Sequence, residues 1–559
     1  MGNLLYLLAG RLGTTIRPVW VIPVAVGLVI GFMSGCDETP QIIEPIATSS
    51  PTALPIVPFK PLPTPLTAEP SLLENNNLIA RVEGTLATPG NVYLEYWGED
   101  GVRFRSKPVP SRETSYLVHA VRLRPNSMYS YQVFGTDVKG RISEGPKGIF
   151  ATGDLPSILR DARFNVLEGQ PTYELTYLEF RQRGFFGLVA IDGEGHIVWY
   201  YTAPAGEEPY VMDQRDNGNI VYLAGGIKVV AHGLVEINPL GEELARSVDL
   251  CPPTGPMHHE VQILSDQRVM YLSRYILRPG HGEPPSPQEG DTIGIWDPKT
   301  GENSIVWNIF DFISPRDRIV PDSNSTLPKQ FMWGGCSEDL TVQDWSHGNS
   351  ARMADDGMVL VSFRHLDQVV SIAPDFRSIR WRLGGPGSDF TFPDPRDKFY
   401  HQHTASQIPN GNILLFDNGN GRSKTEGGEY SRGLELELDF GNMTARKVWE
   451  FRYNPDIFAD CCSIVHRLDN GNSLLVFGLN AVDVCCRPFT IIEVNPSGNV
   501  VWEVQHLSAG KFSQYRVYPS DSVMGEVRVS DNYPLRWHTG CCPILVSNTI
   551  IEQCHHLMD

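Results

Sequence analysis

The stretch VNPSGNVVW at residues 494–502 decides the fold, because it joins two apolar runs through a tight turn. Asn, Pro and Gly favour the turn, while Val and Trp favour strands on either side of it. The same form, an apolar run, an Asp or Asn turn with Gly and a second apolar run, recurs along the chain. Copies lie at 191–199, 237–248, 295–307, 372–381 and 438–449, and the copy at 237–248 lacks the final Trp. Repetition of this kind indicates a repeat architecture.

A second element alternates with the first and consists of an apolar strand, a turn of the Asp-Asn-Gly-Asn type and another apolar strand. Its copies are centred on residues 218, 267, 357, 411 and 471. Alternating the two hairpins gives four-stranded blades, so the sequence predicts an all-β, six-bladed β-propeller over residues 154–559. The copy at 191–199 has no first hairpin before it, and we expect its missing strands to come from residues 515–551. Seven blades with one degenerate blade is the alternative.

The chain has 559 residues, which exceeds the size that one hydrophobic core usually supports. Residues 37–76 are rich in Pro, Ser and Thr and predict a stalk. Short alternating runs over 77–153 predict a small β-sandwich that is similar to fibronectin type III domains. Within it, the stretch 123–133 resembles a strand with its preceding corner, where a Tyr hydroxyl ties the chain back to the backbone.

The first 36 residues have the features of an export signal. Arg11 and Arg17 precede an uncharged, largely apolar run over 18–35, and Cys36 follows directly. The residues 33–36, MSGC, resemble a bacterial lipobox, which predicts that Cys36 carries a lipid. An uncleaved signal anchor is the alternative, since about 18 residues just span a bilayer. Either one predicts a membrane-anchored protein that functions outside the cytoplasm, in the periplasm or at the cell surface.

The formal net charge of −19 argues against nucleic acid as a partner, because backbone binding needs clustered Lys and Arg. A small anionic substrate stays possible, since one buried Arg outweighs a diffuse acidic surface.

Nine cysteines follow Cys36, and six of them form the vicinal pairs 461–462, 485–486 and 541–542. Outside the cytoplasm cysteines usually form disulfides, and an odd number leaves at least one unpaired within the chain. A zinc site of Cys541, Cys542 and the segment 554–556 is the alternative for part of this set.

Candidate site residues emerge when blades are aligned on their turn glycine. Positions eight and ten residues before the turn hold polar side chains in three successive blades, and positions two apart on a strand share one face. Seven residues after the turn come further polar side chains, expected to be cross-strand neighbours of the first set. We therefore expect Arg274 near His259, Arg364 near Asn349 and Asn418 near His403. Together with His347 and His401, these residues place two guanidinium groups opposite several imidazoles, with few carboxylates nearby. This composition favours an anion pocket over a metal site.

Five motifs in this part of the chain resemble the arylsulfate sulfotransferase family, and they come in the family's order. The motifs are DWSHGNS at 344–350, SFRH at 362–365, WRLGG at 381–385, QHTA at 402–405 and LFDN at 415–418. The resemblance implies a six-bladed propeller that moves a sulfuryl group from an aryl sulfate to a phenol, without metal or cofactor. Its members use small-molecule donors and acceptors.

Carried onto these positions, the resemblance implies that His403 is a nucleophile that forms a sulfohistidine. His347, Asn349 and Arg364 hold the sulfuryl oxygens, and His259 lines the same pocket. His401, Arg274 and Asn418 are expected to bind substrate, the first two on the repeat alignment alone. The vicinal cysteines differ from the single disulfide that the family has in a loop. The sequence leaves the oligomeric state open, with a homo-oligomer as one alternative.

Other functions fit part of the same pattern. A metal-dependent hydrolase would use His259, His347 and His403 as ligands. A non-catalytic propeller would bind a ligand at the channel mouth, and a sulfatase-like enzyme would use water in place of the phenol.

Overall fold

The protein is described by a computed structural model, and every residue that it describes lies in the compact unit Pro61–Asp559. The residues it describes are 61–182, 185–225, 233–248, 254–278, 280, 286–316, 329–331, 340–478, 489–506 and 514–529. The predicted export signal, Cys36 and most of the predicted stalk lie outside them. Within these ranges no helix has the length and apolar character needed to cross a membrane.

The secondary structure of the described ranges is almost entirely β, which confirms the predicted all-β class. The helices there are short 3₁₀ turns, namely η1 (Ile309–Asp311), η2 (Arg364–Leu366), η3 (Pro395–Asp397) and η4 (Lys424–Glu426).

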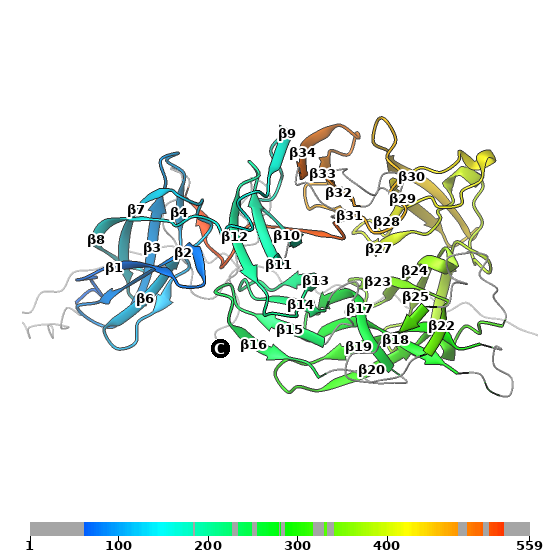
Figure 1. Cartoon of the computed structure of the whole chain (residues 1–559), viewed down its shortest axis with the longest axis horizontal. Helices are drawn as coiled ribbons and strands as arrows, with labels where there is room; N and C mark the ends of the chain where they lie inside the picture. The colour runs from blue at the N-terminus through cyan, green and yellow to red at the C-terminus, as the bar shows by residue number, and fades with distance from the viewer. Residues whose placement is uncertain are drawn as a thin grey trace, which may run out of the picture. The chain divides into compact units, whose positions relative to one another are not determined.

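The first strands form two sheets that enclose a common core, coloured blue to cyan in Figure 1. One sheet contains β1 (Glu69–Leu73), β2 (Asn76–Thr85) and β6 (Ser115–Ala120). The other contains β3 (Asn91–Trp97), β4 (Arg103–Arg105), β5 (Val109–Pro110), β7 (Met128–Thr136), β8 (Ile142–Ala151) and, from the far end of the chain, β36 (Val527–Arg528). β1 lies in the stretch expected as stalk, so the sheet begins earlier than predicted.

The corner expected before β7 is present in this sandwich. The backbone N–H of Arg124 donates to the hydroxyl of Tyr129 at 2.9 Å, which ties the chain back at the start of the strand. The prediction of a tyrosine corner is confirmed.

The remaining described strands form six sheets, each built on four antiparallel strands. In order from the inner strand outward, the first contains β35 (Val517–Ser520), β10 (Leu175–Gln182), β11 (Phe185–Asp192) and β12 (Ile197–Thr202). The second contains β13 (Pro209–Gln214), β14 (Ile220–Ala224), β15 (Gly233–Ile237) and β16 (Glu243–Arg246). The third contains β17 (Thr254–Ile263), β18 (Val269–Leu277), β19 (Gln288–Trp296) and β20 (Asn303–Asn308), with β22 (Leu340–Asp344) parallel to β19 and β21 (Lys329–Phe331) paired with β22.

The fourth sheet contains β23 (Gly348–Met353), β24 (Val359–Phe363), β25 (Gln368–Ile372) and β26 (Ile379–Leu383). The fifth contains β27 (His403–Gln407), β28 (Ile413–Asp417), β29 (Arg432–Asp439) and β30 (Thr444–Phe451). The sixth contains β31 (Ile464–Arg467), β32 (Ser473–Phe477), β33 (Thr490–Val494) and β34 (Val500–His506), with β9 (Phe164–Gly169) at its edge.

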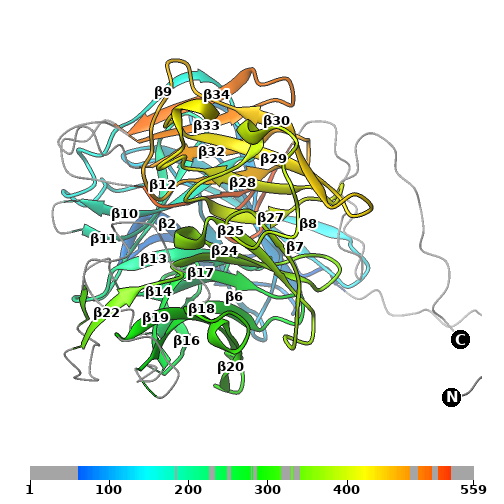
Figure 2. The same ribbon diagram turned by 90° about the vertical axis from the view of Figure 1, so that its right-hand side faces the viewer.

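Each sheet packs on the next, and the last packs on the first. Apolar cores fill the space between consecutive sheets, and one core joins β10 and β11 of the first sheet to β32, β33 and β34 of the sixth. A fully buried aliphatic or aromatic side chain contributes about 1.5–3 kcal/mol, so these cores hold the ring together. Figure 2 shows the sheets in succession, from the third and second through the fourth and fifth to the sixth.

Every hairpin predicted from the two repeated elements is present. The first element gives β11–β12, β15–β16, β19–β20, β25–β26, β29–β30 and β33–β34, and the second gives the inner hairpins from β13–β14 to β31–β32. The turn residue at 267 is Gln instead of Gly, and it adopts the left-handed conformation with φ of 73°.

The first sheet is completed from the C-terminal side by β35, which pairs with β10. The expectation that several strands come from residues 515–551 is wrong for the described part, because β10 itself supplies the second strand. The sequence before 191 lacks the Asn-Gly turn of the other inner hairpins, since β10 and β35 are not consecutive.

The inner strands β13, β17, β23 and β27 carry register shifts near the end where the site lies. Val211, His259, His347 and Thr404 have φ between 43° and 56° at or next to these shifts. β-bulges re-aim side chains, and a positive φ is strained for residues other than Gly. These inner strands therefore have irregular backbone at the end where the site lies, although the sheets they belong to are otherwise regular.

Candidate functional site

His403 begins β27 and is almost fully buried, at 2% exposure. Its Nδ1 lies 2.7 Å from Oδ1 of Asn418. The amide group of Asn418 donates to the carbonyl oxygens of Ala459 at 2.7 Å and Cys462 at 3.2 Å, which fixes its oxygen toward His403. An oxygen only accepts, so Nδ1 of His403 carries the proton and Nε2 keeps the lone pair.

The pKa of His403 lies well below its ordinary value of 6.5. Burial is the main cause, because it penalises the charged ring, and the positive charge of Arg364 acts in the same direction. The imidazole is therefore neutral at pH 7, as a nucleophile must be.

Arg364 lies in η2, just past the end of β24, and is largely buried. Its Nη2 donates to the carbonyl of Asp460 at 3.2 Å. Its backbone N–H donates to the carbonyl of His347 at 3.0 Å, and Asn349 falls in the register shift of β23. The prediction that Arg364 is the cross-strand neighbour of Asn349 is therefore wrong, and its backbone neighbour is His347.

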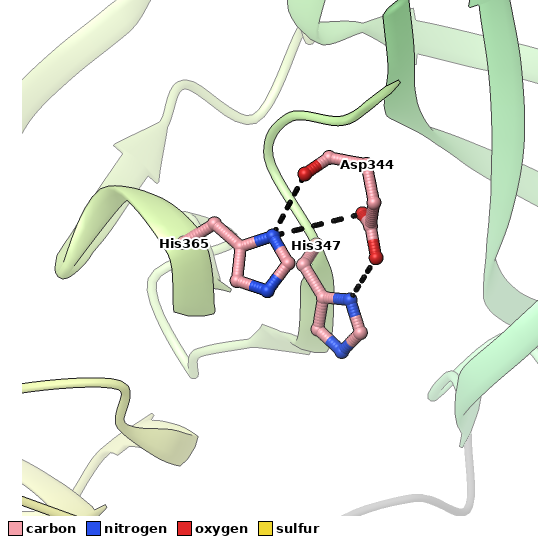
Figure 3. Close-up of side chains that lie close together, drawn as sticks. All are labelled: Asp344, His347 and His365. Atoms are coloured by element: carbon pink, nitrogen blue, oxygen red, sulfur yellow. Dashed lines mark hydrogen bonds and ion pairs between the residues drawn. The ribbon is translucent and has the colours of Figure 1, made fainter. Parts of the chain in front are cut away.

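Asp344, at the end of β22, holds two imidazoles (Figure 3). Its carboxylate accepts from Nδ1 of His347 at 2.7 Å, and its backbone carbonyl accepts from Nδ1 of His365 at 2.8 Å. The two rings lie 4.6 Å apart between centroids. Burial and the neighbouring His347 lower the pKa of His365 to about 3. With Nδ1 occupied by Asp344, His347 has Nε2 available to give or take a proton.

His259 lies beside His347, with ring centroids 5.2 Å apart. Its Nδ1 is 2.8 Å from Nδ1 of His258, and Nε2 of His258 is 3.2 Å from Asp291. Burial lowers the pKa of His259 well below 6.5, and the neighbouring cations add to this effect. His259 is therefore a neutral ring at the edge of the same site.

Close packing explains why the DWSHGNS motif has a glycine at position 348. The N–H of Gly348 donates to Asp291 Oδ2 at 2.7 Å, and a Cβ there would lie 2.8 Å from the Asp291 carboxyl carbon. Only glycine lets the chain approach this carboxylate while His347 points to the site.

Asn349 is fully buried and its amide group donates to the carbonyl of Gln402 at 2.7 Å. Its own carbonyl accepts from Arg516 Nη2 at 2.7 Å and from the Tyr515 hydroxyl at 3.3 Å. Arg516 is paired with Glu260 at 2.7 Å, both fully buried. The Asn349 amide group thus supports the backbone beside His403.

Two predicted substrate-binding residues lie at the border of this cluster. His401 precedes β27 with φ of 53°, and its ring lies 3.3 Å from Asp367 and 6.2 Å from the His365 ring. The expectation that it shares a strand face with His403 is wrong, because it is not part of the strand. Arg274 forms an ion pair with Glu289 at 3.0 Å, and its charge lowers the pKa of His259.

The expectation of few carboxylates is also wrong. Asp291, Asp344 and Asp367 bond to the histidines, and Glu289 pairs with Arg274. Asp291 and Asp367 are distant in sequence from the histidines they contact, which hides this proximity, whereas Asp344 lies only three residues before His347. The site is an array of oriented imidazoles with Arg364 beside the nucleophile candidate, not a purely cationic pocket.

A cavity of about 460 Å³ opens next to His365. Its walls include the aromatic side chains Phe390, Phe392, Phe399 and Tyr400. Gly384 and Gly385 of the WRLGG motif line it, and Gly384 has φ of 81° with the carbonyl of Asp367 only 2.6 Å from where a Cβ would lie. Polar residues, among them His365, Asp367 and Lys398, also line the cavity, and aromatic walls with a few polar groups suit a small aromatic molecule.

Asp344, His347 and His365 also have the composition of a metal site, since their ligand atoms lie within 4.8 Å of one another. One carboxylate and two imidazoles are ligand types that zinc and similar cations accept. Among the described residues, the predicted ligand set of His259, His347 and His403 is not grouped in this way.

Sequence reasoning missed four residues of the site: Asp344, His365, Tyr515 and Arg516. The first two stand inside motifs that were recognised, so their position was a usable signal. Tyr515 contacts the rings of Tyr210, His259 and His403, at 4.9, 5.6 and 6.1 Å between centroids. It precedes β35, which has no hairpin turn of its own, so alignment on turn glycines could not find it or Arg516.

Comparison with known proteins gives a family match over most of the propeller. The family described as Arylsulfotransferase (ASST) matches residues 172–516, which is more than half of the chain. The arylsulfate sulfotransferase AssT of Escherichia coli O6:H1, strain CFT073, is 28% identical over 174 residues. That match covers 24% of this chain and 28% of the relative, so the chain spans less than a third of the relative's length.

Solved structures with some similarity include a protein of unknown function from Bacteroides caccae. It has 15% identity and a TM-score of 0.39, and the match covers 62% of this chain and all of that one. The virginiamycin B lyase of Staphylococcus aureus has 12% identity and a TM-score of 0.30, over 77% of this chain and 99% of that one. TM-scores this low add nothing to the argument.

Proposed function

Because this chain belongs to the arylsulfotransferase family, we propose that it transfers a sulfuryl group from an aryl sulfate to a phenol through His403. One observation carries the proposal. Asn418 holds the buried, neutral His403 in the tautomer that leaves the lone pair on Nε2, next to the charge of Arg364.

In the first half-reaction, Nε2 of His403 attacks the sulfur of the aryl sulfate. The N–S bond forms as the bond from sulfur to the phenolic oxygen breaks, and the electron pair leaves with that oxygen. His347, when protonated, donates its Nε2 proton to the departing phenolate, with Asp344 stabilising the imidazolium. Arg364 stabilises the charge on the sulfuryl oxygens, a role worth on the order of 3 kcal/mol for a well-placed donor.

The second half-reaction reverses these steps with a different phenol. His347 takes the proton of the incoming hydroxyl, the oxygen attacks sulfur, and the pair of the N–S bond returns to Nε2 of His403. The two steps share one acid–base residue and one nucleophile, so ping-pong kinetics follow.

The cavity beside His365 is the proposed place for the aryl group. Its four aromatic side chains fit a flat ring, and His365, whose ring packs against His347, also lines it. A phenolic oxygen placed beside His365 lies on the side of the acid–base residue.

The test is the release of a chromogenic phenolate from its aryl sulfate, with and without a second phenol. We expect release that rises with the second phenol, formation of its sulfate ester, and loss of both in His403→Ala. Phenolate release without formation of a sulfated acceptor would show that the protein is a hydrolase. Absence of phenolate release from any aryl sulfate would contradict the proposed sulfotransferase activity.

A metal-dependent hydrolase is the second candidate, and the grouping of Asp344, His347 and His365 favours it. A bound divalent cation would supply an activated water there. Loss of activity on chelation, with recovery on adding zinc, would support this candidate over transfer through His403.

We also propose that the protein acts outside the cytoplasm, attached to the membrane at its N-terminus. The basic flank, the apolar run and Cys36 support this. Cell fractionation of the wild type and of Cys36→Ala tests it, since loss of the lipidated cysteine should release the protein if Cys36 is the anchor.

A further inference from the structure

The turn at residues 460–463 supports both proposed catalytic elements. The carbonyl of Asp460 accepts from Arg364 Nη2 at 3.2 Å, and the carbonyl of Cys462 accepts from the Asn418 amide at 3.2 Å. Asn418 in turn orients His403. Any shift of this turn therefore changes the position of the guanidinium group and the support of the imidazole together.

The backbone of this turn is strained. Cys462 has φ of 62° and Ser463 has φ of 80°, which are left-handed conformations that side chains other than Gly rarely adopt. Such conformations persist only where surrounding contacts enforce them. Two consecutive strained residues next to the site call for a restraint.

The two vicinal cysteines of this turn supply a candidate restraint. Cys461 and Cys462 are free thiols, and their Sγ atoms lie 2.8 Å apart. Both residues are partly exposed, while the contact with Cys461 and burial raise the pKa of the Cys462 thiol well above its ordinary value, so Cys461 is the thiol that reacts first. The other cysteines of the chain lie outside the described residues.

We propose that Cys461 and Cys462 are a redox pair, whose disulfide holds the 460–463 turn and thereby Arg364 and Asn418 in place. The structure represents its dithiol state. Adjacent Cα atoms are about 3.8 Å apart, below the usual range for a disulfide of about 4.4–6.8 Å, so this bond is strained and easily reduced. Strained, accessible disulfides are typically regulatory.

The bond forms by exchange with a disulfide-bearing oxidant. The Cys461 thiolate attacks one sulfur of the oxidant and releases the other as a thiolate. Cys462, after losing its proton, attacks Sγ of Cys461 and releases the second oxidant sulfur. The protein loses two electrons and two protons, and the oxidant becomes two thiols.

The disulfide form is the more active one. In the dithiol state the left-handed residues and the contacts of the Asp460 and Cys462 carbonyls are present but held without a covalent link, so we expect the turn to leave this arrangement more often than in the disulfide state. Misplacement of a catalytic group by about 1 Å can cost up to about 100-fold, and a partial shift costs less, so we expect reduction to lower turnover about 10-fold. This consequence rests on the proposed function, while formation of the bond does not.

Peptide mapping tests the bond independently of activity. The full chain, purified without reductant, is alkylated with iodoacetamide under denaturing conditions and digested with trypsin. The peptide 453–467 contains these two cysteines and no others. We expect this peptide without alkylation and with two hydrogens fewer than the dithiol form. Two alkylated cysteines, or a link to another peptide, would overturn the proposal.

Turnover then tests the consequence. The wild type should lose about 10-fold in kcat with a thiol-free reductant and regain it with oxidised glutathione. Cys461→Ala should have the lower rate in both conditions. A matched control, Cys485→Ala with Cys486→Ala, removes another vicinal pair and should respond to reductant like the wild type. Equal wild-type rates in the two states, with the bond mapped, would contradict the proposed coupling.

If no aryl sulfate is turned over, the coupling is still measurable at the imidazole. In protein with ¹⁵N-labelled histidine, the signals that disappear in His403→Ala identify His403. We expect these signals to shift on reduction of the wild type but not of Cys461→Ala. Identical spectra in both redox states would overturn the coupling, whatever reaction the protein catalyses.

Discussion

Nδ1 of His403 and Oδ1 of Asn418 lie 2.7 Å apart, and the amide group of Asn418 donates to two backbone carbonyls on its other side. One asparagine thus assigns the proton of the imidazole. Burial and the charge of Arg364 keep the ring neutral, and the uncharged amide of Asn418 favours the imidazolium less than a carboxylate would. The pairing suits a nucleophile better than a general acid.

Replacement of Asn418 by Ala should lower kcat about 100-fold with a small change in KM, because the imidazole loses its fixed tautomer and orientation. Asn418→Asp should also be impaired, since a carboxylate raises the pKa of His403 and places a negative charge near the sulfuryl group. Steady-state kinetics on one aryl sulfate measure both. Asn410→Ala, on the exposed turn of the same hairpin, is the control, and an Asn418→Ala enzyme with unchanged kcat would contradict the tautomer argument.

Asp344→Asn separates the acid–base role of His347 from binding. An amide supports the imidazolium less well than a carboxylate does, so proton donation to the leaving phenolate should weaken. We expect the loss in rate to grow with the pKa of the leaving phenol, from a few-fold for nitrophenols to about 100-fold for unactivated phenols. A plot of rate against leaving-group pKa measures this, and parallel plots for variant and wild type would argue against His347 as the acid.

The aromatic cavity is tested by Phe392→Ala. This side chain lines the cavity, is half-buried and packs on the edge of the core between the fourth and fifth sheets, so the stability of the variant is measured alongside its kinetics. We expect KM for aryl sulfates to rise about 10-fold with kcat nearly unchanged, because a ring contact of about 1–1.5 kcal/mol is lost. Ile149→Ala, on the exposed face of β8, is the control. An unchanged KM would place the aryl group elsewhere.

Acid should destabilise the protein through its buried neutral histidines, and His506 is the simplest case. It lies among Phe164, Phe180 and Phe489, and burial lowers its pKa to about 4. Below pH 6.5 the unfolded chain binds a proton that the folded chain does not, so the free energy of unfolding falls as pH falls. The contribution is about 1.4 kcal/mol per pH unit between 6.5 and 4.

Urea unfolding at several pH values measures this contribution. His506→Phe and His506→Gln should both reduce the pH dependence by about that amount, although they differ in how well they fill the space. A slope equal to that of the wild type in both variants would contradict the burial argument for His506.

The hairpins could be predicted from the sequence because their information is local. Asn-Gly turns and apolar flanks act over a few residues, and every predicted hairpin forms. The pairing of β35 with β10 could only be expected in outline, since nothing local marks two strands more than 300 residues apart as partners.

The site could be predicted only in part. Alignment on turn glycines brought His259, His403 and Asn418 to notice, but it assumed regular strands. The register shifts in β17, β23 and β27 move side chains away from those positions, which explains the wrong neighbours given to Arg364 and His401. Asp344 stands inside the DWSHGNS motif, but the parallel pairing of β22 with β19 that positions it is a long-range contact without a local signal.

The most direct test of the central claim is to trap the sulfuryl group on the enzyme. The protein is mixed with an aryl sulfate in the absence of a phenol, stopped at mildly alkaline pH and digested with trypsin. The peptide 399–422 contains both His401 and His403, so fragmentation assigns the modified ring. Transfer through His403 predicts a sulfuryl group on His403 that a phenol removes and that His403→Ala never acquires. Phenolate release with sulfate ester formation, but with an unmodified His403 peptide or with the group on another residue, would contradict it.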